Sequence, residues 1–185
     1  MTFEERFKPF GFSALEMQHF LEKNNAFIAG GFALAAYLGV DAFKGSDIDI
    51  YLPEIITDEQ LILKGYSVVH YNKYPMTESI RNVVTYTRGY EKIQLVVVKN
   101  KNPYDILNEF DIDICKVMIT SSLSIVSHCL PYVKRMRIVG VEYPDGLYPR
   151  TVKYISRGFT LVDNNDNEIV DTLKHVNEIL KNHRR

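Results

Sequence analysis

The stretch Ala29-Gly30-Gly31-Phe32, followed fifteen residues after Gly31 by Ser46-Asp47-Ile48-Asp49-Ile50-Tyr51, decides the fold of this chain. A glycine pair leaves a backbone turn without side chains, so a ligand can approach the backbone closely. Asp47 and Asp49 are one residue apart in an apolar strand sequence, which places both carboxylates on the same side of that strand. Two like charges held so close together favour a divalent cation between them. The two stretches together predict a phosphate site beside a metal site.

Two carboxylates in an Asp-x-Asp pattern also have a simpler interpretation, which is an edge strand with its acidic face in solvent. The glycine pair upstream of Asp47 and Asp49 argues against that interpretation, because an ordinary edge strand does not require it. The combination therefore favours a ligand site.

The composition is that of an ordinary globular protein. The chain has 185 residues, 46% of them apolar and 24% charged, which is enough to bury a full core in one domain with at most a small appendage. A net charge of -1 provides no basic field for long nucleic acids, although residues 181–185 form a small positive patch. Cys115 and Cys129 are too few for a zinc site. We find no secretory leader and no membrane-spanning run, and therefore expect a soluble cytoplasmic protein without a membrane partner.

Periodicity in the first half alternates between helices and strands. The capping pattern from Ser13 to Glu16 predicts a helix that ends at Asn24-Asn25. A buried strand over 26–28 then leads into the glycine turn and a helix over 32–38. After the Asp-x-Asp strand, we expect a helix from 57 to 64 and a strand from 66 to 71.

The middle of the chain is rich in β-branched residues. The runs 83–87 and 93–98 are separated by a loop containing Gly89 and predict a hairpin. Asn102-Pro103 predicts a short helix to Glu109. Alternation over 110–117 then predicts a strand with Asp111, Asp113 and Cys115 on one side.

The C-terminal third has helical periodicity. We expect helices over 127–136, 149–159 and 166–181, the last of them amphipathic. A turn over 142–146 is the expected boundary between the α/β part and the helical C-terminal part. The sequence therefore predicts an α/β fold: a mixed central sheet with flanking helices over 1–142, and a helical C-terminal part over 143–185 packed on it.

The Gly30-Gly31-Phe32 turn and the Ser46-Asp47-Ile48-Asp49 strand resemble the signature of the nucleotidyltransferase superfamily that includes DNA polymerase beta, the CCA-adding enzymes and small aminoglycoside-modifying enzymes. The resemblance covers about the first 120 residues. It implies that Gly30 and Gly31 contact phosphate and that Ser46 supports the turn. It also implies that Asp47 and Asp49 are catalytic metal ligands.

The resemblance further implies two divalent ions, Mg²⁺ or Mn²⁺, which hold the triphosphate of an NTP such as ATP and activate an acceptor hydroxyl. Hard carboxylate oxygens suit these ions. Two ions about 3.5–4 Å apart neutralise the leaving pyrophosphate and lower the pKa of the attacking hydroxyl. The acceptor itself, whether a small molecule, a protein or a nucleic-acid end, is not specified by these residues.

The third carboxylate of the superfamily is where this sequence departs from the pattern. In many relatives it lies on the strand that corresponds to Ile93-Gln94-Leu95-Val96, and here that position is Gln94. An amide binds a hard dication poorly. Either the site is defective, or another acid serves; we predict Asp111 as the third catalytic metal ligand, with Asp113 as the alternative.

Four residues near the C-terminus recur at helical spacing, namely Arg150, Lys153, Tyr154 and Arg157. Such a cationic stripe is usually a solvated face. The functional alternative is nucleotide binding by Lys153, Tyr154 and Arg157. Together with Phe110-Asp111, the stripe resembles a branch of the superfamily found in viruses and some eukaryotic genomes.

Three functions compete at this point. The first is a metal-dependent nucleotidyltransferase that moves a nucleoside monophosphate from an NTP to a hydroxyl with release of pyrophosphate. The second, supported by Gln94, is a catalytically degenerate relative that binds a nucleotide or a partner. The third is an unrelated α/β binding domain in which Asp47 and Asp49 are merely exposed.

Overall fold

The computed structural model describes residues 1–41, 43, 46–54, 61–62, 64–72, 79–99, 102–128, 134–139 and 148–169. Contacts divide the chain into two compact units. The first contains Met1–Phe110 and Cys115–Cys129, and the second contains Asp111–Ile114 and Leu130–Arg185. The expected boundary at 142–146 stays a prediction, because it lies outside the described residues.

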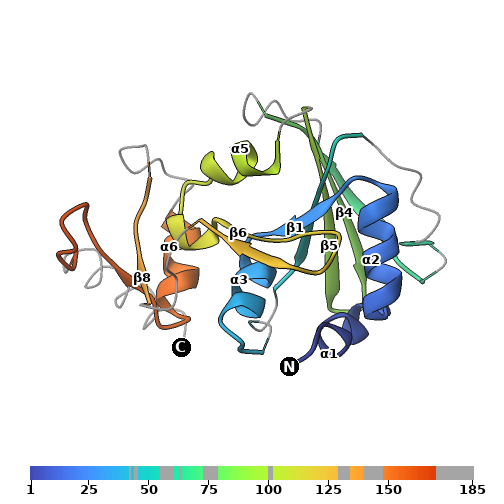
Figure 1. Ribbon diagram of the computed structural model, residues 1–185, viewed down its shortest axis with the longest axis horizontal. Coiled ribbons are helices and arrows are strands. Elements are labelled where there is room, and N and C mark those ends of the chain that lie inside the picture. Colours follow the sequence, from blue (N-terminus) through green and yellow to red (C-terminus); the bar gives the residue numbers. More distant parts are fainter. Residues whose placement is uncertain are drawn as a thin grey trace. The chain divides into compact units, whose positions relative to one another are not determined.

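A seven-stranded mixed sheet forms the first unit (Figure 1). Its strands are β1 (Phe27–Ala29), β2 (Ile48–Leu52), β3 (Ser67–Asn72), β4 (Ile80–Arg88), β5 (Glu91–Val98), β6 (Val117–Ile119) and β7 (Ile125–Ser127). Their order is β3-β4-β5-β2-β1-β6-β7, and only β2 and β5 run parallel. The predicted mixed α/β fold and the predicted β4–β5 hairpin are confirmed.

The helices of this unit begin at side-chain caps or at the glycine turn. They are α1 (Phe3–Phe7), a 3₁₀ turn η1 (Lys8–Phe10), α2 (Ala14–Lys23), α3 (Gly31–Tyr37) and α5 (Pro103–Asn108). The capping box predicted at Ser13 is present, and Thr2 forms a second one that the sequence analysis did not anticipate. Of the helix expected over 57–64, only Leu61, Ile62 and Lys64 are described, and Leu61 and Ile62 are helical.

Alternation along β2 gives the sheet one buried apolar face. Ile48, Ile50 and Leu52 are each at most 1% exposed. Helix α3 contacts β1, β2 and β6. The rings of Phe7 and Phe32, from α1 and α3, stack with centroids 5.5 Å apart. Burial of these side chains stabilises the sheet by about 1.5–3 kcal/mol for each large apolar residue.

The opposite face of the sheet also carries buried apolar residues. Its apolar cluster contains buried residues of β1, β5, β6 and α5, with Tyr51 and Phe110 packed against them. The Tyr51 ring stacks on Phe27 at 5.2 Å and lies 5.7 Å from the Phe110 ring. Asp47 and Asp49 precede Tyr51 at the period of two, so they continue this face beyond the apolar cluster.

The second unit contains the helix α6 (Tyr148–Ile155) and two paired strands, β8 (Arg135–Met136) and β9 (Thr160–Leu161). The helix expected over 149–159 is therefore confirmed up to Ile155. The helix expected over 127–136 is wrong at both ends, because β7 ends at Ser127 and β8 contains 135–136. A single proline in that window, Pro131, is consistent with this outcome, since proline breaks helix interiors.

The start of the expected helix over 166–181 is also wrong. Glu168 forms an isolated bridge with Val162, and Asp163 accepts hydrogen bonds from the Asn165 and Asn167 backbone amides. Such side-chain bonds stabilise a turn instead of a helix. Residues 170–181 lie outside the described part of the chain.

Glu16 links α2 to Lys64, which precedes β3, and gives a pH-dependent contribution to stability. Hydrogen bonds from Lys64 and from Ser13 lower the pKa of Glu16 to about 2. Because this pKa is lower than the ordinary value of 4.5, the ionised carboxylate stabilises the fold above pH 4.5, and the contribution is lost as the pH falls toward 2.

Replacing Glu16 by Gln is therefore expected to lower the free energy of unfolding by no more than about 1 kcal/mol at neutral pH, as for exposed ion pairs. The difference from wild type should vanish near pH 2. Urea titrations at several pH values measure it, and Lys64→Met should reproduce much of the effect. A difference independent of pH would contradict this role of the Glu16 charge.

Candidate nucleotide and metal site

Asp49 lies in β2, and Asp47 comes directly before that strand. In β2 itself, Ile48 and Ile50 are buried while Asp49 is half-buried, which is the alternation that the sequence predicted. The register places Asp49 opposite Ala29 of β1 and opposite Gln94 of β5. The structure therefore brings Asp49 next to the end of β1, where the glycine turn begins.

Gly30 holds the turn against the Asp49 carboxylate. Its backbone has φ +79° and ψ -146°, a combination that is close to unique to glycine. A Cβ atom on Gly30 would lie 3.2 Å from Asp49 Oδ2. Gly31 is the first residue of α3, and the Gly30 carbonyl accepts the first hydrogen bond of that helix, from Leu34 N, at 2.9 Å. The backbone of Gly30 therefore lies directly beside the Asp49 carboxylate.

Ser46 precedes the carboxylates and is half-buried, with its backbone amide donating to the Phe43 carbonyl at 2.8 Å. This bond closes a turn immediately before Asp47. Its predicted role in supporting the phosphate turn stays a prediction, as do the phosphate contacts of Gly30 and Gly31.

Lys92 contributes a charge to the site that the sequence analysis missed. Its Nζ lies 3.4 Å from Asp47 Oδ2, with the two side chains 42% and 24% exposed. The parallel pairing of β2 with β5 causes this contact, because Ile48 is in register with Ile93 and the preceding residues are therefore neighbours. The signal in the sequence is the period of two that places Lys92 and Gln94 on one face of a strand.

Gln94 lies beside Asp49 in the sheet, at the position where the resemblance implied a third carboxylate. Its Nε2 donates to Thr85 Oγ1 of β4 at 3.2 Å. A carboxylate here would repel Asp49 unless a cation lay between them, whereas the amide adds no charge. The pair of Asp49 on β2 and Gln94 on β5 therefore supplies one carboxylate, where the two-ion site expected from the resemblance would have two.

Asp111 and Asp113 do not lie on a strand, so the expected acidic strand over 110–117 is wrong. Asp111 precedes an isolated bridge, and Asp113 begins the 3₁₀ turn η2 (Asp113–Cys115). Asp113 Oδ1 accepts from the backbone amides of Ile114 and Arg137 at 2.7 and 2.8 Å. These local bonds compete with a strand ladder and explain the difference.

Arg150 binds Asp111 within the second unit. Its Nη1 donates to both carboxylate oxygens, at 2.6 and 2.5 Å. Asp111 therefore has a positive partner from α6 in place of a metal ion. Its assignment as a metal ligand stays a prediction.

The two acids should differ in their effect on stability. Asp113→Ala removes an acceptor of two backbone amides and is expected to cost about 1–3 kcal/mol. Asp111→Ala breaks a more exposed pair and should cost about 1 kcal/mol or less. Denaturant unfolding measures both, and Asp113→Asn is the matched control, since it keeps an oxygen acceptor. Equal losses for the two alanine variants would contradict a structural role for Asp113.

The stripe on α6 is only partly exposed. Lys153 is exposed, whereas Tyr154 is 4% exposed and its ring packs edge-on against Phe159 at 6.0 Å. The Arg157 guanidinium lies 5.2 Å from the Tyr154 ring centroid. Tyr154 thus has a place in the core of its unit. Nucleotide binding by Lys153, Tyr154 and Arg157 stays a prediction.

The donor set fits a divalent ion at Asp47 and Asp49. Asp49 is half-buried in β2 and Asp47 lies two residues before it, and carboxylate oxygens suit Mg²⁺ or Mn²⁺. Within the described residues, no group of three or more His, Cys, Asp or Glu side chains could hold a metal ion. The assignment of Asp47 and Asp49 as metal ligands stays a prediction, in which further ligands would come from phosphate or water.

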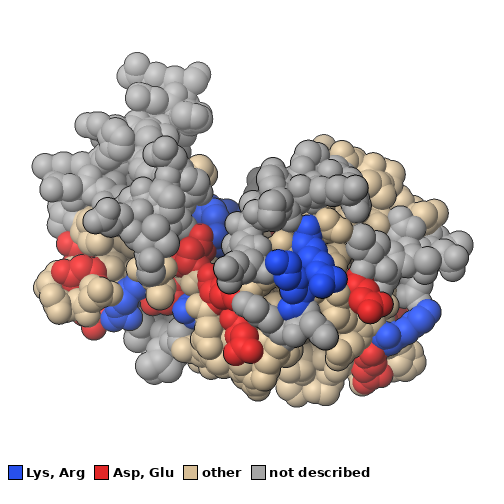
Figure 2. Space-filling view, turned by 90° about the horizontal axis from the view of Figure 1, so that it is seen from above, with Lys and Arg blue, Asp and Glu red and all other residues tan. Residues whose placement is uncertain are grey.

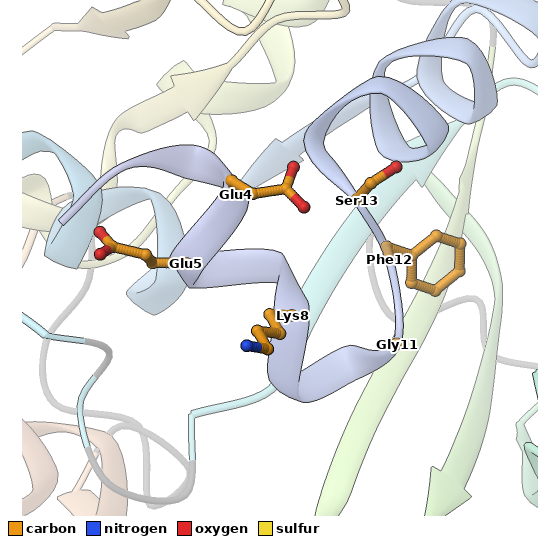
Figure 3. Close-up of a pocket in the computed structure, with 6 residues that line it drawn as sticks. All are labelled: Glu4, Glu5, Lys8, Gly11, Phe12 and Ser13. Atoms are coloured by element: carbon orange, nitrogen blue, oxygen red, sulfur yellow. The ribbon is translucent and has the colours of Figure 1, made fainter.

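A cavity of about 400 Å³ lies away from these residues, at the N-terminal segment (Figure 3). It is lined by Glu4, Glu5, Lys8, Gly11, Phe12 and Ser13. Glu4 accepts from the Ala14 amide at 2.7 Å, and Glu5 and Ser13 act in the two capping boxes. These polar groups already stabilise helix ends, so we do not assign the cavity a function.

Surface charges of both signs lie close together. On the face shown in Figure 2, basic and acidic side chains are interspersed over the described part of the chain. On this face, the pattern agrees with the small net charge of -1. In the described residues, no helix is long and apolar enough to cross a membrane.

Solved structures of nucleotidyltransferases share this fold. The chain matches a tRNA-processing enzyme in apo form with a TM-score of 0.52 at 15% identity, over 97% of this chain and 49% of that one. It matches a tRNA-processing enzyme with CTP with a TM-score of 0.51 at 16% identity, over 88% of this chain and 46% of that one. It also matches a CCA-adding enzyme with CTP with a TM-score of 0.53 at 15% identity, over 80% of this chain and 38% of that one. The chain thus spans less than half of each of these proteins. At such identity, the matches establish a nucleotidyltransferase-like fold.

A family model identifies the family to which the chain belongs. Residues 2–128 match the model of the Gabija anti-defense 2 family, and the chain belongs to that family. A search of curated proteins finds no match. The matched residues include the glycine turn, both carboxylates and the hairpin that carries Lys92 and Gln94.

Proposed function

We propose that the chain is a metal-dependent nucleotidyltransferase that moves a nucleoside monophosphate from an NTP to a hydroxyl acceptor and releases pyrophosphate. The observation that carries the proposal is the closeness of Asp49 to the Gly30 turn, where a Cβ atom on Gly30 would lie 3.2 Å from Asp49 Oδ2, with Asp47 two residues before Asp49. A side-chain-free turn beside two carboxylates suits a triphosphate that arrives with Mg²⁺ or Mn²⁺.

Each residue has a distinct part in this proposal. The turn at Gly30 and Gly31, supported by Ser46, leaves space for phosphate oxygens next to Asp49. Asp47 and Asp49 supply the oxygen ligands, and they orient the triphosphate by holding its ion. A divalent ion bound there would neutralise phosphate charge and make the acceptor hydroxyl more acidic. Catalysis then depends on positioning and electrostatics, as is general for phosphoryl transfer.

The acceptor is proposed from the family name alone. Members of an anti-defense family act against a defence system, which the name gives as Gabija. We propose that a hydroxyl of a component of that system accepts the nucleotide. The CTP found with two of the similar structures supports an NTP as the donor, without specifying which base this chain uses.

A second function is favoured by two observations at the same site. Lys92 pairs with Asp47, and Gln94 replaces an acid beside Asp49. Both features lower the negative charge available for metal ions. A catalytically degenerate protein that binds a nucleotide or a partner would have this arrangement.

Label transfer distinguishes the two functions. The full chain is incubated with each NTP labelled at the α-phosphate, with Mg²⁺ or Mn²⁺, and with components of the defence system. An active enzyme transfers label to one component and releases pyrophosphate, and EDTA abolishes both. Nucleotide binding without label transfer in any combination would favour the degenerate protein. A variant with Gln94→Glu that gains activity in an otherwise inert protein would show that the position had lost its carboxylate.

A further inference from the structure

Lys92 places a positive charge within the carboxylate site itself. Its ammonium lies 3.4 Å from Asp47 Oδ2, and the Asp47 side chain is only 24% exposed. A partly buried carboxylate attracts a cation more strongly than one in bulk water, because the local dielectric constant is lower. In the structure, the cation next to Asp47 is therefore supplied by the chain.

The neighbouring position removes a negative charge. Gln94 is in register with Asp49, and its amide donates to Thr85 Oγ1 on the next strand. Lys92 and Gln94 are two residues apart on β5, so both belong to the face that carries Asp47 and Asp49. Strand β5 thus adds the Lys92 cation next to Asp47. It has Gln94 beside Asp49, where a site for two ions would need a third carboxylate.

We propose that the Lys92 ammonium takes the place of one of two metal ions, so that Asp47 and Asp49 hold a single divalent ion. This inference rests on the proposed function and departs from the two ions expected from the sequence. Two dications with three carboxylates leave one excess positive charge. One dication with two carboxylates and one ammonium leaves the same excess, so either arrangement presents the same net charge to a triphosphate.

The replacement has a chemical consequence. A lysine ammonium is a point charge with three hydrogen-bond donors on a flexible stem, so it can neutralise Asp47 or a phosphate oxygen. It cannot coordinate and acidify a hydroxyl as a metal ion does. Lys92 is therefore a positioning residue that sets how many ions bind and how strongly.

Titration of the full chain with Mn²⁺, followed by electron paramagnetic resonance, tests this role without requiring activity. Wild type is expected to bind one ion at this site. Lys92→Met removes the competing charge and should tighten Mn²⁺ binding about tenfold, whereas Lys92→Arg keeps the charge and should leave the affinity near that of wild type. Lys99→Met, on the exposed end that follows β5, is the matched control and should not change it.

The outcomes separate this inference from the proposed function. Two Mn²⁺ ions bound by wild type at Asp47 and Asp49, or an unchanged affinity in Lys92→Met, would overturn the role of Lys92 and leave the proposed function standing. No binding by wild type together with binding by Lys92→Met would overturn the single bound ion of this inference and would also remove metal dependence from the function. No binding by either protein would overturn both. Circular dichroism checks folding, and Lys92→Gln replaces Lys92→Met if that variant does not fold.

Discussion

The double variant Asp47→Asn, Asp49→Asn is expected to lose nucleotidyl transfer by a factor of a thousand or more, while the fold persists. Asp49 lies in β2 beside the Gly30 turn, and Asp47 is two residues before it. Removing both removes the charge that holds a divalent ion, and a thousandfold loss corresponds to about 4 kcal/mol in the activation free energy. Label transfer from an α-labelled NTP measures the effect.

The stability of that variant distinguishes loss of chemistry from loss of structure. Like charges at Asp47 and Asp49 repel each other, and Lys92 compensates only part of this repulsion. We therefore expect the free energy of unfolding to stay within about 1 kcal/mol of wild type, the scale of exposed ion pairs. The matched control is Asp105→Asn, which removes one exposed carboxylate on α5 and should keep activity. Full activity in a folded double variant would show that the metal assignment is wrong.

Gly30→Ala is expected to produce the second large effect, on both stability and nucleotide affinity. With φ +79° and ψ -146°, any side chain at this position is strained by about 1–3 kcal/mol. The new Cβ would also lie 3.2 Å from Asp49 Oδ2 and displace that carboxylate or the turn. Thermal unfolding and titration with an NTP analogue in the presence of Mg²⁺ measure the two effects.

The neighbouring glycine provides the control for this prediction. Gly31 is the first residue of α3, where alanine is a better helix former, so Gly31→Ala should keep or slightly raise stability. If Gly31 contacts phosphate, its substitution by Val weakens nucleotide binding more than it disturbs folding. If Gly30→Ala binds nucleotide as wild type does, the turn does not belong to the site.

Local sequence patterns predicted most elements of the first unit. Capping at Ser13, the glycine turn and the β-branched runs of β4 and β5 each specify an element within a few residues. The short hairpin of β6 and β7 was missed, because Val117–Ile119 and Ile125–Ser127 are too short to show a period. Local propensity also failed at Asp113, where side-chain hydrogen bonds to the backbone replace strand pairing.

The sequence predicted only those parts of the candidate site that are formed by residues close together in the chain. Two carboxylates on one face of a strand follow from the period of two, and the glycine pair follows from its composition. The contact of Lys92 with Asp47 depends on the parallel pairing of β2 and β5, which joins segments about 40 residues apart. Sequence periodicity contains no information about which strands are neighbours, so Lys92 became visible only in the structure.

In the proposed function, the Gly30 turn and the carboxylates of Asp47 and Asp49 form one metal-dependent nucleotide site. Isothermal titration of the full chain with non-hydrolysable analogues of ATP and CTP, with Mg²⁺ or with EDTA, tests whether they do. We expect binding that requires Mg²⁺ and that is lost in the Asp47→Asn, Asp49→Asn variant. Binding of equal affinity in EDTA and in that variant would show that these residues do not form such a site.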